Sequence, residues 1–192
     1  MNQHQRKLKT EPWLLMMDLD GTVWDHLDIS SVRPPYHDAG PGKIQNQDGI
    51  TITVFPEALE FIRWCRSKGA ITCTLSWNYR DYVMEALKKL GIMELFDYHE
   101  TEFSPAKDQR ILHLLDVLRQ NGTTLTPERI VYVDDRDIHM DDIRRNVGNI
   151  FFLHIWKDVR NYEEARTIIR NRIIQRERED PSTWQGDESE HR

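Results

Sequence analysis

Short apolar runs alternate along the chain with segments in which apolar residues recur at the spacing of one helix face. The apolar runs have the length of buried strands and lie at residues 13–17, 70–75, 96–99, 129–133 and 149–155. The helical segments lie at about residues 56–68, 79–90, 104–120, 138–146 and 162–174. Because most of the strand runs are continuously apolar, the pattern predicts a parallel sheet that helices cover on both faces. The expected fold is a Rossmann-like three-layer α/β/α sandwich with a mainly parallel sheet.

A long polar stretch at residues 25–50 interrupts this alternation directly after the first strand. It contains Pro34-Pro35 and Gly40-Pro41-Gly42 among many Asp, Asn and Gln residues, which is the composition of a loop. A loop of this length inside a compact domain is usually functional or disordered. We expect a short flap over the site, too short to be a full cap domain, with a hairpin arm at residues 50–54.

The same pattern sets the expected domain boundaries. Residues 13–175 form one α/β domain that includes the flap, and a chain of 192 residues is long enough to bury a sizeable core. Residues 1–12 are polar and are expected to be a flexible N-terminus. Residues 176–192 are charged and hydrophilic, so we expect a disordered tail.

Composition narrows the possible partners. A net charge of −6 and a pI near 5.8 argue against a nucleic-acid-binding surface built on general basicity. The chain has two cysteines and no CxxC motif, so we expect no disulfide framework or zinc site and a reducing, cytoplasmic location. No apolar run approaches the roughly 20 residues that span a bilayer, and no membrane partner is expected. The oligomeric state stays open.

Two carboxylates close the first apolar run. Asp18 and Asp20 are followed at once by Gly21 and Thr22. In extended backbone the two aspartates would share a face, and the glycine allows a sharp turn. Buried carboxylates are costly unless they bind something, and ligands of open α/β sheets lie at this end of the strands. The motif therefore marks a candidate site.

Other chemical residues occupy equivalent places farther along the chain. Ser76 closes the second strand, Lys107 lies in the first turn of a helix, and Asp134 and Asp135 close a later strand. In a parallel sheet these places converge on one edge. Hydrolysis of a phosphate ester needs a nucleophile, positive charge around the phosphoryl oxygens and a proton for the leaving group. Carboxylate oxygens suit Mg²⁺, and Lys107 would add a fixed positive charge.

The segment Asp18-Leu19-Asp20-Gly21-Thr22 resembles the first motif, DxDGT, of the haloacid dehalogenase-like (HAD) hydrolases. Ser76, Lys107 and the pair Asp134-Asp135 are similar to the second, third and fourth motifs of that superfamily. The similarity covers about residues 12–156. With no room for a cap domain, the chain is most similar to the capless magnesium-dependent phosphatase-1 branch.

The resemblance implies a role for each matching residue. Asp18 would be the nucleophile and a metal ligand, and Asp20 the acid/base that also lends its main-chain carbonyl to Mg²⁺. Asp135 would bind the metal directly, and Asp134 directly or through water. Ser76 and Lys107 would bind the phosphoryl group.

Neighbours of these residues are further candidates for substrate or phosphate binding, namely Gly21, Thr22, Trp77 and Asn78. Asn78 also has the side chain and position of an N-cap for the following helix. Trp24 and Trp77 follow catalytic positions, where either pocket lining or core packing would explain them. His139 stands where the phosphatase-1 branch carries Asn, either as a support of the site or as an exposed residue.

The expected function is that of a Mg²⁺-dependent phosphatase, a phosphomonoester hydrolase that forms an aspartyl-phosphate. Its substrate would be a small phosphate ester or a phosphoprotein, since a site without a cap is open to both. One alternative is a phosphoryl or acyl transferase on the same scaffold. Another is a non-catalytic HAD-like binding module, against which the intact set of acidic residues, Ser76 and Lys107 argues.

Overall fold

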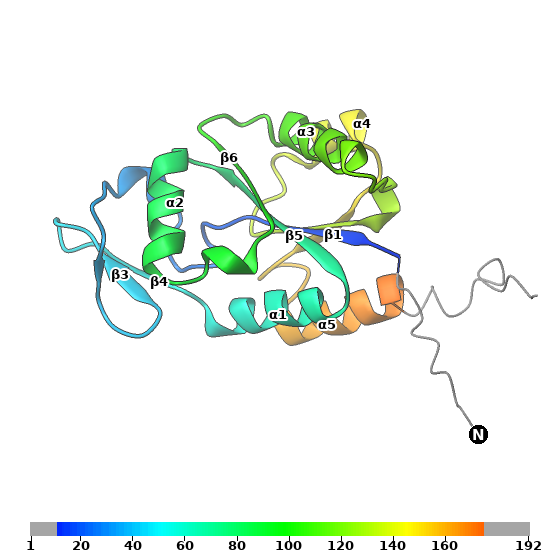
Figure 1. Cartoon of the computed structure of the whole chain (residues 1–192). Helices are drawn as coiled ribbons and strands as arrows, with labels where there is room; N and C mark the ends of the chain where they lie inside the picture. The colour runs from blue at the N-terminus through cyan, green and yellow to red at the C-terminus, as the bar shows by residue number, and fades with distance from the viewer. Residues whose placement is uncertain (1–10, 175–192) are drawn as a thin grey trace, which may run out of the picture.

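The structure, a computed structural model, describes residues 11–174 of the chain. Its centre is a five-stranded parallel sheet in the order β6-β5-β1-β7-β8 (Figure 1). The strands are β1 (Trp13–Met17), β5 (Ala70–Trp77), β6 (Tyr98–Glu102), β7 (Ile130–Asp134) and β8 (Phe151–His154). The first strand is central, and the chain builds outward first on one side of it and then on the other. A crevice for a ligand is expected at the carboxyl end of such a central strand.

Helices cover both faces of this sheet. They are α1 (Pro56–Ser67), α2 (Arg80–Lys89), α3 (Lys107–Gln120), α4 (Met140–Asn146) and α5 (Tyr162–Ile169), the last continued by a π-helical turn, η4 (Arg170–Ile174). In Figure 1, α1 and α5 lie side by side on one face, and α3 and α4 lie on the other. The predicted three-layer α/β/α fold with a parallel sheet is confirmed.

The core consists of two apolar clusters, one on each face of the sheet. Leu15 and Met17 belong to the cluster under α1 and α5, whereas Leu14 and Met16 belong to the cluster under α3 and α4. Successive strand residues point to opposite faces, so a central strand that is buried on both sides must be apolar at every position. This explains the unbroken apolar run that precedes Asp18.

The stretch at residues 25–50 is more ordered than predicted. It contains a short 3₁₀ helix, η1 (Ile29–Ser31), and the strands β2 (His37–Asp38) and β3 (Lys43–Gln45), which form an antiparallel sheet with β4 (Thr51–Thr53). The predicted hairpin arm supplies β4. Buried apolar side chains of this segment join the main core. Strands of two or three residues are too short to show a period in the sequence. The segment is a small folded arm, and no cap domain is evident among residues 11–174.

The start of α2 corrects one prediction. The N-cap of this helix is Tyr79, which makes no side-chain capping bond, so the predicted N-cap role of Asn78 is wrong. The physical reason is that the Asn78 amide donates instead to Asp20 and Ser76.

Some predictions concern residues that lie outside the described part of the chain. These are the tail at residues 176–192 and most of the flexible N-terminus at residues 1–12. Within residues 11–174, no helix combines the length and the apolar character that crossing a membrane requires. Cys65 and Cys73 are free and buried.

Replacing Leu15 by Ala should test whether β1 anchors the fold. The side chain is fully buried in the cluster under α1 and α5. Truncation of such a residue costs roughly 2–5 kcal/mol in the free energy of unfolding. Urea unfolding followed by circular dichroism measures the loss. Leu112→Ala on the exposed side of α3 is the control, and it should change stability by less than roughly 0.5 kcal/mol. Equal effects of the two substitutions would contradict this account of the core.

Candidate active site

A buried lysine joins the two acidic strand ends at the carboxyl edge of the sheet. Lys107, the first residue of α3, donates from Nζ to Asp18 Oδ1 and to Asp134 Oδ2, both at 2.7 Å. All three side chains are almost completely buried. Asp18 follows β1 and Asp134 ends β7, so parallel pairing of these strands places the two carboxylates side by side. The ammonium between them offsets their mutual repulsion.

Tyr132 completes this group, although the sequence reasoning missed it. Lys107 Nζ donates a third hydrogen bond to the Tyr132 hydroxyl at 2.7 Å, and that hydroxyl donates to Asp134. An ammonium has three donors, so all of them are used. Tyr132 lies two residues before Asp134 on β7, where strand alternation puts both side chains on the same face. That spacing is the signal that could have identified it.

Three carboxylates form a cluster that fits a divalent cation. Asp18, Asp134 and Asp135 each offer an oxygen, and these oxygens lie within 4.8 Å of one another. Asp18 Oδ2 and Asp135 Oδ1 are buried and have no hydrogen-bond partner. Arg136 Nε is 3.9 Å from the latter oxygen. Buried carboxylate oxygens without partners are unfavourable, and an all-oxygen set of this kind suits Mg²⁺. The residues present therefore fit the metal that the sequence predicted.

The pKa values of the cluster reflect its burial. Burial and the neighbouring Asp134 raise the pKa of Asp18 to about 8, although Lys107 opposes this shift. Burial, again with Asp134, raises the pKa of Asp135 to about 6. Burial also acts on Asp134, but its ion pair with Lys107 keeps the pKa of this carboxyl below its ordinary value. Burial therefore works against the ionised form of Asp18, and Lys107 offsets part of this effect.

Asp20 turns its carboxylate toward a different set of partners. Oδ1 accepts from the Trp24 indole at 2.6 Å, and Oδ2 accepts from the Asn78 amide at 2.9 Å and from the Ile29 N–H at 3.2 Å. Burial raises the pKa of Asp20 even though these hydrogen bonds oppose the shift. A raised carboxyl pKa is what an acid/base group requires near neutral pH. Trp24 is fully buried, and it both packs in the core and orients Asp20.

Asn78 connects Asp20 with Ser76. Its Nδ2 atom also donates to Ser76 Oγ at 2.7 Å, while its Oδ1 atom is buried and has no hydrogen-bond partner. Ser76 lies near the end of β5, the neighbour of β1 in the sheet. The structure thus brings Ser76, Asn78 and Asp20 together on one side of Asp18.

Gly21 and Thr22 connect the loop after β1 with Asp135, which follows β7. Gly21 has a φ of +62°, and a Cβ atom at this position would lie 2.7 Å from Asp135 Oδ2. Only glycine tolerates both conditions. Thr22 Oγ1 accepts from the Asp135 N–H at 3.1 Å. The N–H groups of Gly21 and Thr22 donate to the carbonyls of His26 and Leu19. Phosphate binding by either residue stays a prediction.

Trp77 and His139 form an aromatic pair beside the site. Their ring centroids are 5.9 Å apart in an edge contact. His139 is 8% exposed, and its Nε2 atom has no hydrogen-bond partner. Burial, together with the nearby Lys107, lowers the pKa of His139 to about 4, so the ring is neutral at pH 7. Trp77 is only partly buried. His139 is therefore a buried neighbour of Lys107 and not an exposed surface residue.

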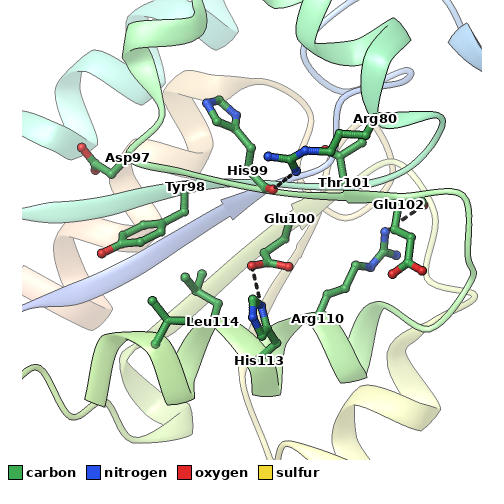
Figure 2. Close-up of a pocket in the computed structure, with 11 residues that line it drawn as sticks. Arg80, Asp97, Tyr98, His99, Glu100, Thr101, Glu102, Arg110, His113 and Leu114 are labelled. Carbon is green, nitrogen blue, oxygen red and sulfur yellow. Dashed lines mark hydrogen bonds and ion pairs between the residues drawn. The ribbon is translucent and has the colours of Figure 1, made fainter. Parts of the chain in front are cut away.

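Arg110 links the site to a groove on the outer edge of the sheet. The groove, about 560 Å³ in volume, lies between β6 and α3, and Figure 2 shows Glu100 and His113 paired across it. Arg110 donates to the carbonyls of Ser76 at 2.6 Å and Ser104 at 3.0 Å. The sequence reasoning missed Arg110, whose signal is its position one helical turn after Lys107. Its contacts tie the end of β5 to the loop that precedes α3.

The raised pKa of Asp18 predicts how stability depends on pH in the metal-free protein. A carboxyl that ionises near pH 4 when unfolded and near pH 8 when folded binds its proton more tightly in the folded state. Stability is therefore fully present below about pH 4 and is lost as pH rises toward 8. Asp18→Asn should remove part of this loss and raise the melting temperature at pH 8, by roughly 3 °C per kcal/mol gained.

Differential scanning calorimetry in EDTA at several pH values measures this effect. Asp141→Asn, at an exposed position of α4, is the matched control and should leave the pH profile unchanged. A wild-type protein that becomes more stable between pH 5 and pH 8 would refute the prediction.

Comparison with known proteins shows what this chain is similar to. No protein-family model matches the chain. Magnesium-dependent phosphatase 1 of Homo sapiens is 26% identical over 140 residues, which are 72% of either chain. A HAD-superfamily hydrolase from Ehrlichia chaffeensis has a TM-score of 0.57 at 10% identity, over 85% of this chain and 98% of that one.

A third relative comes from Bacteroides fragilis. The N-terminal part of this protein, which contains a phosphatase domain and was solved with Mg, has a TM-score of 0.55 at 18% identity. The alignment covers 83% of this chain and 40% of that one. At such identities the two structures support the fold alone. The sequence match to the human enzyme, taken together with this fold, supports a HAD-like hydrolase of the magnesium-dependent phosphatase-1 type, which is a HAD-type phosphatase.

Proposed function

We propose that the protein is a Mg²⁺-dependent phosphomonoester hydrolase that works through an aspartyl-phosphate on Asp18. The observation that carries the proposal is the different environment of the two oxygens of this carboxylate. Lys107 holds Oδ1, while Oδ2 is buried, has no hydrogen-bond partner and lies in the cluster with Asp134 and Asp135. Such a group is positioned to react and needs positive charge around it to stay ionised.

In the first step, the Asp18 carboxylate attacks phosphorus, and the bond from phosphorus to the leaving oxygen breaks. Asp20 gives its proton to that oxygen, so the alcohol leaves in neutral form. The raised pKa of Asp20 supports this acid role. Mg²⁺ bound among the three clustered carboxylates would offset the repulsion between Asp18 and the phosphate. The products of this step are the alcohol and phosphorylated Asp18.

In the second step, Asp20 is the base. It takes a proton from a water molecule whose oxygen attacks phosphorus, and the bond to Asp18 breaks. Inorganic phosphate is released, and both aspartates return to their starting states. The Trp24, Ile29 and Asn78 donors hold the Asp20 carboxylate in one orientation, which supports its use in both steps.

Two further groups would assist the transfer of the phosphoryl group. Lys107 keeps a fixed positive charge beside Asp18 while negative charge moves onto the leaving group. Ser76 Oγ, held by Asn78, has a hydroxyl hydrogen to donate to a phosphoryl oxygen. The substrate is a small phosphate ester or a phosphoprotein, because no cap domain in the described part of the chain restricts access. The cytoplasmic location stays a prediction.

Phosphate release from an aryl phosphate tests this function. Turnover should require Mg²⁺ and stop in EDTA, and Asp18→Asn should lower kcat by at least roughly 10³-fold because the nucleophile is lost. Circular dichroism checks that the variant folds. Asp142→Asn, at an exposed position of α4, is the matched control and should keep wild-type turnover.

Two results would count against the mechanism. Activity retained by Asp18→Asn would exclude the aspartyl-phosphate route. If the wild-type protein shows no turnover, Mg²⁺-dependent binding of beryllium fluoride tests the site without a cognate leaving group. Failure of that binding as well would favour a non-catalytic HAD-like binding module.

A further inference from the structure

Three side chains from one segment, the end of β8 through the start of α5, support the loops that carry the acidic residues. His154 Nε2 lies 2.8 Å from the Asp135 carbonyl oxygen. Trp156 Nε1 donates to the Gly21 carbonyl at 2.7 Å, and the Tyr162 hydroxyl donates to the Thr22 carbonyl at 2.6 Å. A carbonyl only accepts hydrogen bonds, so His154 carries its hydrogen on Nε2.

Trp156 has an unusual backbone conformation. It is the one non-glycine residue with a positive φ, +69°, among residues 11–174. A bulky side chain rarely adopts this backbone conformation, and it persists only where the surroundings hold it. Trp156 is 42% exposed, so core burial alone does not explain it. The indole bond to Gly21 and ring contacts with Phe55 and Tyr162, at centroid distances of 5.4 and 5.6 Å, hold it in place.

The position of the Gly21 backbone affects the position of the Asp135 carboxylate. The adjoining Cα of Gly21 packs so closely on Asp135 that a Cβ atom there would lie 2.7 Å from Oδ2. Thr22 Oγ1 accepts from the Asp135 N–H on the other side of the same contact. A shift of Gly21 therefore displaces the Asp135 carboxylate relative to Asp18 and Asp134. The spacing of the three carboxylates depends on where Trp156 holds this turn.

We propose that Trp156 is a positioning residue for the metal site. Its indole N–H fixes the Gly21 carbonyl and, through Gly21, the Asp135 carboxylate, while His154 and Tyr162 support the neighbouring carbonyls. The inference rests on the proposed function, because it takes the carboxylate cluster as the Mg²⁺ site. Partners outside the ligand shell change metal affinity or activity by about 10- to 100-fold when they are removed.

Trp156→Phe is the informative variant. It keeps an aromatic ring between Phe55 and Tyr162 and removes the N–H donor. Isothermal titration of the substrate-free protein with Mg²⁺ should show a dissociation constant weaker by about tenfold. In the aryl phosphate assay, the Mg²⁺ concentration for half-maximal rate should rise by a similar factor. Because the nucleophile is intact, kcat at saturating Mg²⁺ should stay close to the wild-type value.

Trp13→Phe is the matched control. Trp13 also donates its indole N–H to a backbone carbonyl, that of Lys68 at 3.1 Å, but at the opposite end of β1. Its loss should lower the melting temperature and leave Mg²⁺ affinity unchanged. Tyr162→Phe removes the donor to Thr22 and should weaken Mg²⁺ binding in the same direction as Trp156→Phe, which keeps the test valid if the latter folds poorly.

Each outcome decides the inference. Mg²⁺ affinity within twofold of wild type in both Trp156→Phe and Tyr162→Phe would overturn it. Equal weakening in Trp13→Phe and Trp156→Phe would also overturn it, since the cause would then be a general loss of stability. If the wild-type protein binds no Mg²⁺ in the titration, the proposed metal site itself fails and the inference fails with it.

Discussion

The ion pairs of Lys107 with Asp18 and Asp134 are the interaction on which the rest of the site depends. The ammonium of Lys107, the first residue of α3, binds the carboxylates at the ends of β1 and β7, and its third donor binds Tyr132. Two carboxylates this close and this deeply buried would repel each other strongly without it. The lysine also holds one oxygen of Asp18 and leaves the other without a partner. The same bonds therefore connect the strand ends and orient the carboxylate that we propose as the nucleophile.

The arrangement separates two chemical tasks. On the β7 side, Asp18, Asp134 and Asp135 form a cluster whose burial opposes ionisation until a cation is present. Metal binding at such a site is coupled to proton release, since the ligands must be deprotonated. On the β5 side, Asp20 is surrounded by hydrogen-bond donors and lies outside that cluster. In the proposed mechanism the first aspartate is the nucleophile and the second transfers the proton.

Segments far apart in sequence contact both the carboxylate cluster and Asp20. The folded arm reaches Asp20 through the Ile29 N–H, so the position of the arm and the orientation of this carboxylate are linked. The segment between β8 and α5 holds the carbonyls of Gly21, Thr22 and Asp135 from the other side. The described chain contains no cap domain, and this small arm contacts the site through Ile29.

The sequence by itself determined the sheet, the helices and the position of the acidic residues at one edge of the sheet. Continuous apolar runs specify strands buried on both faces, and the carboxyl ends of parallel strands share an edge, which brings Asp18, Lys107 and Asp134 together. Only the tertiary structure decided the side-chain partners. The bond of Trp156 to Gly21 joins residues 135 positions apart, and the amide of Asn78 binds Asp20 where a helix cap was predicted. The spacing of apolar residues indicates whether a segment is a helix or a strand and which of its faces is buried. The pairing of polar groups depends on rotamers and distances that exist only once the elements have packed.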